Sequence, residues 1–150
     1  CIHLDDSHAD DCDRRRRYPG AFDWALRAAV AARRAGLVSC LHFHAAPDNA
    51  TPHHLEQYFD LAYRVGAAFV RLIEPPASTP LSQKQYDLLE AAYLLYNSEP
   101  AYAAYPIVEY PGYEQRRNRY WITDYFPDLP QKQLKEKKTV DRKPKELALV

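Results

Sequence analysis

The chain has 150 residues, of which 47% are hydrophobic and 27% charged, a composition typical of one globular domain with a sizeable core. Its formal net charge is zero, so it lacks the overall basic excess that favours binding to nucleic acid or an acidic membrane. No apolar run reaches the roughly 18 residues of a membrane span, and the start lacks the basic-then-apolar pattern of a signal peptide. We therefore expect a soluble, cytoplasmic protein without nucleic-acid or membrane partners.

The three cysteines, Cys1, Cys12 and Cys40, are too widely spaced for a disulfide framework or a C-x-x-C metal site, so we expect reduced thiols. The chain contains no methionine and begins with a cysteine inside a strand-like run. This start predicts an internal piece of a longer protein or a processed product.

The first 110 residues alternate between short apolar runs and amphipathic segments. The apolar runs predict strands at 1–4, 37–44, 67–73 and 106–110. Apolar residues spaced three and four apart predict helices at 21–35, 52–65 and 82–97.

Local signals mark the ends of the second and third helices. Thr51 suits the N-cap of the second helix, and Pro52 suits its first residue because the missing N–H would be unpaired there. Gly66 suits a left-handed stop. Ser82 and Gln85 have the spacing of a capping box at the start of the third helix.

The segment 5–20 is expected to be a polar loop. It places Asp10, Asp11 and Asp13 directly before four arginines at 14–17. Adjacent arginines suit phosphate binding, but their acidic neighbours favour local ion pairs on a solvated loop.

Strands that alternate with helices predict right-handed β-α-β crossovers and a parallel sheet. Three such units in succession favour part of a (β/α) barrel over a doubly wound sheet, and no Gly-x-Gly-x-x-Gly or Walker-type loop follows any strand. We assign residues 1–117 to this partial barrel and residues 118–150 to a divergent, largely irregular tail. From residue 131 onward, basic residues outnumber acidic ones seven to three. A short strand at 119–123 and a helical turn at 134–138 are the only elements expected in the tail.

In a parallel α/β sheet, functional side chains gather at the carboxyl ends of the strands. The polar residues expected there are Asp5, Asp6, Ser7, His8, His42, His44, Glu74, Glu109 and Tyr110.

His42 and His44 are two residues apart on a strand, so they point to the same side of the sheet. With a carboxylate from a neighbouring strand they would suit Zn²⁺ or Mn²⁺, but we favour the alternative, a polar face directed at the barrel mouth without metal. Cys40 shares this side, yet no nucleophile elbow surrounds it. Arg71, inside a buried strand, requires an acceptor, and a neighbouring carboxylate is favoured over a bound ligand.

Several short motifs follow one another in a definite order and spacing: Leu4-Asp5-Asp6-Ser7, Gly20-Ala21-Phe22, Ala35-Gly36-Leu37, Asn49-Ala50-Thr51-Pro52-His53-His54-Leu55-Glu56, Val65-Gly66 through Ile73-Glu74-Pro75, and Tyr105-Pro106 through Gln115-Arg116. Together they resemble the second half of the barrel of a radical S-adenosylmethionine enzyme, of the kind with a SPASM-type C-terminal cluster region. The resemblance covers residues 1–117.

The resemblance implies a partial (β/α)₆ barrel. In such enzymes, reductive cleavage of S-adenosylmethionine at a [4Fe–4S] cluster yields a radical that abstracts hydrogen from a small-molecule or peptide substrate. The matching positions that would contact the cofactor in this chain are Asp5 and Ser7, His42 or His44, and Ile73 with Glu74.

The chain departs from the family at both cluster regions. The motif C-x-x-x-C-x-x-C is absent, and the cysteines expected after Tyr113-Glu114-Gln115-Arg116 are replaced by other residues. We therefore expect a fragment or frame-shifted product of a radical S-adenosylmethionine oxidoreductase that neither binds its cofactors tightly nor catalyses the reaction alone.

Two alternatives remain open. One is a metal-dependent barrel isomerase or hydrolase that uses His42, His44 and Glu74. The other is a non-catalytic α/β interaction module whose basic tail binds an acidic partner. An incomplete barrel would also expose strand edges and apolar helix faces, which predicts self-association.

Overall fold

The computed structural model describes residues 1–112 of the chain. The strand expected at 119–123, the helical turn expected at 134–138 and the basic tail as a whole lie outside the described residues. The last part of the resemblance, from Tyr113 onward, lies outside them as well.

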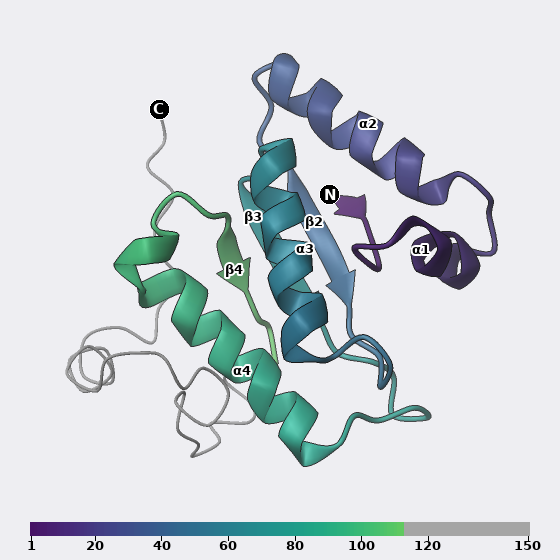
Figure 1. Ribbon diagram of the computed structural model, residues 1–150, viewed down its shortest axis with the longest axis vertical. Helices are drawn as coiled ribbons and strands as arrows, with labels where there is room; N and C mark the ends of the chain where they lie inside the picture. Colours follow the sequence, from purple (N-terminus) through teal and green to yellow (C-terminus); the bar gives the residue numbers. More distant parts are fainter. Residues whose placement is uncertain (113–150) are drawn as a thin grey trace.

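The described part of the chain is built on one parallel sheet of four short strands (Figure 1). The strands are β1 (Ile2–His3), β2 (Cys40–His44), β3 (Phe69–Ile73) and β4 (Ile107–Glu109), and they pair in chain order. The register aligns His3 with His42, and His42 with Arg71. The predicted α/β class with a parallel sheet is confirmed, and every expected strand in this part of the chain is present.

The strands are shorter than predicted at their amino ends. The run expected to begin at Leu37 becomes a strand only at Cys40, which aligns with Phe69 at the start of β3. Leu37 and Val38 are 65% and 62% exposed. The apolar run of the sequence is longer than the strand because a strand extends only as far as a neighbouring strand forms hydrogen bonds with it.

Three of the helices coincide closely with the predicted ones. They are α2 (Ala21–Arg34), α3 (Pro52–Val65) and α4 (Gln83–Ser98), and a short 3₁₀ turn, η1 (Pro100–Tyr102), follows α4. The Thr51 hydroxyl accepts the backbone N–H of His54, and Ser82 and Gln85 form the expected capping box. The predicted N-terminal caps of α3 and α4 are therefore confirmed.

The expectation of a loop over residues 5–20 is wrong, because residues Ala9–Arg16 form helix α1. Its acidic residues, Asp10 and Asp11, lie in the first turn and its arginines lie in the last turn. This order stabilises the helix, because each charge lies near the end of the helix dipole of opposite sign. Cys12 is the one buried residue of α1, so apolar periodicity could not reveal this helix. Arg17 ends it in a left-handed conformation, with φ of 53°.

Asp13 of α1 also begins the next helix. Its carboxylate accepts the backbone N–H groups of Gly20 at 2.8 Å and Phe22 at 2.9 Å. These hydrogen bonds lower the pKa of Asp13, with the bond from Phe22 as the largest cause. Asp13 therefore acts as an N-terminal cap for α2, where backbone N–H groups have no helical partner.

The hydrophobic core lies between the sheet and the helices. Alternate strand residues such as Phe43 and Val70 are almost fully buried, and the Phe43 ring packs edge-on against Tyr58 of α3 at 4.8 Å. Farther along, the Phe59 ring packs on Tyr96 of α4 with centroids 4.1 Å apart. Tyrosines of this chain thus fill the space between neighbouring helices.

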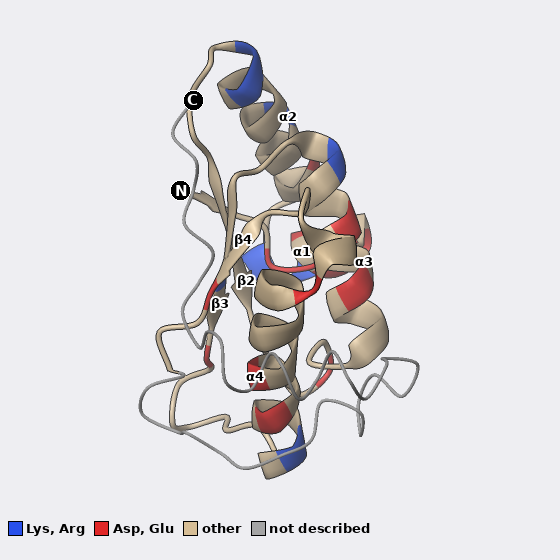
Figure 2. Cartoon of the chain, turned by 90° about the vertical axis from the view of Figure 1, so that its left-hand side faces the viewer, with Lys and Arg blue, Asp and Glu red and all other residues tan. Residues whose placement is uncertain are grey.

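All the described helices lie on one side of the sheet (Figure 2). Within residues 1–112, no helix covers the opposite side, which we call the open face. It carries the intervening strand residues, which align across the sheet: the polar His3, Cys40, His42, His44, Arg71 and Glu109, and the apolar Phe69, Ile73 and Ile107. A parallel sheet whose strands follow chain order and whose helices lie on one side is a singly wound α/β arrangement.

Candidate functional site

Three histidines gather on the open face, where β1 and β2 run side by side. His3 aligns with His42 in the parallel register, and their rings meet edge-on with centroids 4.9 Å apart. The Nδ1 atom of His3 lies 3.0 Å from Nε2 of His44. Each of the three rings offers one nitrogen that is within 4.8 Å of the others. We call His3, His42 and His44 the histidine cluster.

His42 is the buried member of the histidine cluster. It is 9% exposed, and neither of its ring nitrogens has a hydrogen-bond partner among the residues that the structure describes. Burial lowers the pKa of His42, and the neighbouring His3 adds to this shift. The His42 ring is therefore held in the neutral form, with a nitrogen lone pair available, at a position where an unpaired polar atom is costly.

His44 connects the histidine cluster to Asp5, the residue two positions beyond β1. The His44 Nε2 atom lies 3.7 Å from Oδ1 of Asp5. Burial lowers the pKa of His44, whereas the Asp5 carboxylate opposes this shift. Asp5 in turn receives Arg16 of α1, with Nε 2.6 Å from Oδ2. The structure thus brings together Asp5 and His44, two of the residues expected at the site.

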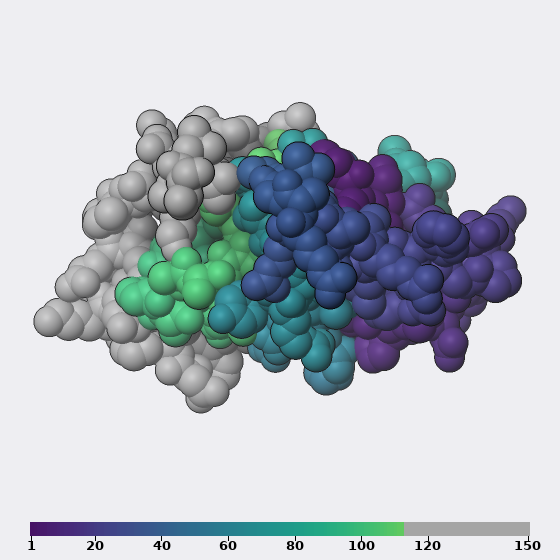
Figure 3. Space-filling model, turned by 90° about the horizontal axis from the view of Figure 1, so that it is seen from above, coloured from purple at the N-terminus to yellow at the C-terminus, as the bar shows by residue number. Residues whose placement is uncertain are grey.

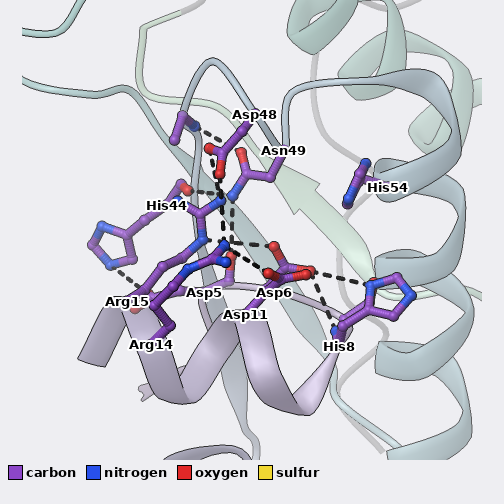
Figure 4. A network of polar contacts seen from close by, with 12 residues as sticks. Asp5, Asp6, His8, Asp11, Arg14, Arg15, His44, Asp48, Asn49 and His54 are labelled. Carbon is purple, nitrogen blue, oxygen red and sulfur yellow. Dashed lines mark hydrogen bonds and ion pairs between the residues drawn. The ribbon is translucent and has the colours of Figure 1, made fainter. Parts of the chain in front are cut away.

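A network of ion pairs extends from Asp5 along the carboxyl edge of the sheet (Figure 4). Arg15 lies 2.7 Å from Asp48 and 3.6 Å from Asp6, and Arg14 lies 2.6 Å from Asp11. The expected local pairing is confirmed for Arg14 and Asp11, whereas Arg15 and Arg16 pair with aspartates outside α1, and a helix rather than a loop presents all three. Because aspartates pair with these three arginines, they do not form a free phosphate-binding surface.

Asn49 is a site residue that the sequence alone did not reveal. It is fully buried, and its side-chain Nδ2 donates to the carbonyls of Asp5 at 3.2 Å and His44 at 3.0 Å (Figure 4). Its Oδ1 accepts the backbone N–H of Ala46 at 2.7 Å. Asn49 therefore holds the ends of β1 and β2 together beneath the site. In the sequence, Asn49 opens the motif Asn49-Ala50-Thr51-Pro52 and follows Pro47-Asp48, a combination typical of a turn rather than of a buried side chain.

A second group of polar side chains, separate from the histidine cluster, surrounds Asp6 beyond the end of β1. The backbone N–H of His8 donates to Asp6 at 3.2 Å, and Ser7 Oγ lies 3.3 Å from Nδ1 of His8. His54 of α3 comes close enough for Asp6, His8 and His54 to offer three ligand atoms within 4.8 Å of one another. Ser7 is thus associated with His8 rather than with the histidine cluster.

Arg71 and Glu109 face each other on the open face, from β3 and β4. The guanidinium Nε and Nη2 atoms of Arg71 lie 2.8 Å and 2.7 Å from Oε2 of Glu109. The hydrogen bond to Glu109 raises the pKa of Arg71. The expectation that a neighbouring carboxylate is the acceptor for Arg71 is therefore confirmed.

Glu74 follows β3 and accepts a hydrogen bond from the Tyr110 hydroxyl at 2.6 Å. Any side chain at Gly112 would collide with the Glu74 carboxylate, so this glycine permits the close approach. Within residues 1–112, the metal-capable group that contains both His42 and His44 has His3 as its third member, not Glu74. Ile73 aligns with His44 across the β2–β3 pair.

The three cysteines are not gathered in one place. Cys12 is buried in the core, whereas the thiols of Cys1 and Cys40 lie within 4.8 Å of each other beside His42. Burial raises the pKa of both Cys12 and Cys40, which makes their thiolates less available. These residues therefore do not fit a [4Fe–4S] cluster, which needs several thiolates around one centre.

None of the helices within residues 1–112 combines the length and apolar character that crossing a membrane requires. Comparison of the chain with models of protein families, with curated proteins and with solved structures finds no match.

Proposed function

We propose that this chain is part of a radical S-adenosylmethionine oxidoreductase, with residues 1–112 forming a sector of its (β/α) barrel. The observation that carries the proposal is the open face of a singly wound sheet. It carries three histidines and an ion pair among apolar side chains such as Phe69 and Ile73, whereas a sheet covered by a second layer of helices is apolar almost throughout.

The strand order supports a barrel more than an open doubly wound sheet. A doubly wound sheet has helices on both faces and reverses its strand order at a switch point. Here the order is β1-β2-β3-β4 and the described helices cover one face (Figures 1 and 2). In a (β/α) barrel, the face opposite the helices lines the interior, and its polar residues lie toward the carboxyl ends of the strands.

The site residues have chemistry suited to S-adenosylmethionine. The carboxylates of Asp5 and Glu74 are acceptors for ribose hydroxyls or the methionine ammonium group, and they follow strands one and three of the sheet. His44 is a neutral hydrogen-bonding group between them in strand order, and Ile73 supplies apolar surface beside it. The residues in this chain would bind and orient the cofactor.

The iron–sulfur cluster is a separate requirement. Cys1, Cys12 and Cys40 do not supply its ligands, because Cys12 is buried in the core and leaves only the pair Cys1 and Cys40 on the open face. We therefore derive no radical step from these residues. The proposal assigns the chain a cofactor-lining role, with its substrate a small molecule or a peptide.

Binding of S-adenosylmethionine to the isotope-labelled full chain tests the proposal by nuclear magnetic resonance. We expect weak binding with chemical-shift changes at Asp5, His44 and Glu74. Glu74→Gln should weaken it, whereas Asp23→Asn, which removes an exposed acid on α2, should not. Shift changes confined to the outer surface of α2, or equal affinities for the two variants, would contradict the proposed site.

The coding DNA provides an independent test of the fragment interpretation. We expect cysteine codons with the C-x-x-x-C-x-x-C spacing upstream of Cys1, and further cysteine codons in another reading frame after Arg117. The absence of both sets would count against membership of a radical S-adenosylmethionine enzyme, whatever the binding experiment shows.

A further inference from the structure

We propose that the histidine cluster, His3, His42 and His44, is a binding site for one divalent transition-metal ion. The proposal does not rest on S-adenosylmethionine binding or on a complete barrel. The sequence favoured a polar face without metal, and the alternative left open placed Glu74 with His42 and His44, whereas here His3 supplies the third ligand.

The distances within the histidine cluster are compatible with a common metal ligand sphere. In a tetrahedral zinc site with Zn–N bonds of about 2.0–2.1 Å, two ligand nitrogens lie about 3.3 Å apart. His3 Nδ1 and His44 Nε2 are 3.0 Å apart, and all three ligand nitrogens lie within 4.8 Å of one another. Modest rotation of the side chains of His3, which is exposed, and His44, which is half-buried, would bring the set to that spacing.

His42 gives an independent reason to expect a ligand. Its ring is 9% exposed, and both of its nitrogens lack a hydrogen-bond partner within the described part of the chain. A buried polar group without a partner costs free energy, and a metal ion bound to one nitrogen would remove much of that cost. His42 comes from β2 beside His3 of β1, so the backbone positions both rings before any metal arrives.

The surroundings suit a metal that prefers imidazole. Three imidazole nitrogens as ligands favour Zn²⁺, Co²⁺, Ni²⁺ or Cu²⁺ over Mg²⁺ or Ca²⁺, which prefer oxygen ligands. Glu109 pairs with Arg71, and Asp5 pairs with Arg16, so carboxylates balance these nearby cations. Asp5 lies 3.7 Å from His44 Nε2, the nitrogen that faces the proposed metal, and so is within reach as a fourth ligand. Three protein ligands otherwise leave one position open for water or substrate.

Titration of the tag-free full chain with Co²⁺ tests the site, because tetrahedral Co²⁺ has a strong visible absorption. We expect one saturable binding event that Zn²⁺ displaces. His3→Gln and His44→Gln should each weaken binding by about 100-fold or more, since loss of even an outer partner costs about 10–100-fold. His53→Gln, an equivalent change at an exposed histidine of α3, should leave the affinity unchanged.

Two neighbouring groups define the outcomes that would overturn the proposal. Cys1 and Cys40 also approach His42, and Asp6, His8 and His54 form a third metal-capable group. Loss of binding in Cys40→Ser, together with a thiolate-to-metal absorption band and normal binding by His3→Gln, would assign the metal to the cysteines. Loss in His8→Gln with normal binding by His3→Gln would assign it to the third group.

The remaining outcomes are equally decisive. Absence of saturable Co²⁺ binding by the full chain would also refute the site. Circular dichroism of His3→Gln and His44→Gln will show whether each variant is folded. Because His3 is exposed, His3→Gln is the less disruptive substitution. If His44→Gln is unfolded, the affinity of His3→Gln alone tests the site. Addition of Zn²⁺ should raise the melting temperature of the wild-type chain and leave that of His3→Gln unchanged.

Discussion

The side-chain amide of Asn49 donates to the backbone carbonyls of Asp5 and His44, at 3.2 and 3.0 Å, and so connects the ends of β1 and β2. Only two residues of β1 belong to the sheet, so its backbone hydrogen bonds to β2 are few. Asn49 therefore contributes to the position of Asp5 and, through it, to the geometry of the open face.

Replacement of Asn49 by alanine should lower the free energy of unfolding by about 1–3 kcal/mol, because it leaves buried carbonyl and N–H groups without a partner. Urea denaturation measures this change. His53→Ala, at an exposed position, serves as the control and should stay within about 0.5 kcal/mol of the wild type. Equal stability of Asn49→Ala and the wild type would show that the amide hydrogen bonds are not stabilising.

The ion pair between Arg71 and Glu109 should contribute little to stability. Both side chains are partly exposed, at 39% and 32%, so solvent screens their attraction. A double-mutant cycle of Arg71→Ala and Glu109→Ala should give a coupling free energy of about 0.2–1 kcal/mol that falls in high salt. A much larger coupling that is independent of salt would indicate that the open face is far less hydrated than the exposures imply.

The cap supplied by Asp13 should make stability dependent on pH in the acidic range. Hydrogen bonds from Phe22 and Gly20 lower the pKa of Asp13 below its usual 3.8. Because the pKa is lower in the folded state, the stabilisation is fully present above pH 3.8 and is lost as the pH falls through the folded value.

Comparison of the wild type with Asp13→Asn isolates this effect. Urea midpoints of both proteins, measured from about pH 6 to about pH 2, should differ most at the upper end and converge in acid. A difference that is constant across this range would mean that the charge on Asp13 does not contribute to capping α2.

Tyr105 should ionise only in strongly alkaline solution. Its hydroxyl donates to Asp60 at 2.6 Å, and this hydrogen bond is the main cause that raises the pKa of Tyr105 to about 12. Because the pKa is higher in the folded state, the stabilisation is present below the usual value of 10.0 and is lost as the pH rises through about 12.

The difference in tyrosinate absorption between the wild type and Tyr105→Phe reports this single hydroxyl among the 12 tyrosines. Asp60→Asn should shift the difference titration toward lower pH, since the charged acceptor is removed. A Tyr105 titration centred near its usual value in the wild type would contradict the hydrogen bond to Asp60.

Self-association is expected if the open face and the sheet edges are accessible. Within residues 1–112, β1 and β4 each pair with a strand on one side. Trp24 is 66% exposed on α2, a helix that lies on the surface seen in Figure 3. Unpaired strand edges and apolar surface both favour association. Light scattering over a range of concentrations should show a rising average mass, and a constant monomeric mass at high concentration would refute this expectation.

Local sequence patterns determined most of the secondary structure. The helices from Pro52 and from Gln83 begin where a hydroxyl caps them, and such signals are readable because capping involves residues within four positions. The shared side of Cys40, His42 and His44 was also predictable, since side chains in a strand alternate with a period of two. Helix α1 was missed because it buries one residue and therefore shows no apolar period.

The composition of the site depended on contacts that are distant in the sequence. His3 joins His42 and His44 only because β1 aligns with β2 in one particular register. Glu109 became the partner of Arg71, and Asn49 reached Asp5, across 38 and 44 positions of the chain. Local patterns thus predict the four strands, the helices α2, α3 and α4, and the strand residues that share a face, because capping and side-chain alternation involve only near neighbours in the chain. Helix α1 and the contacts between faces depend on the tertiary structure, because strand register and helix docking result from packing of the whole sheet.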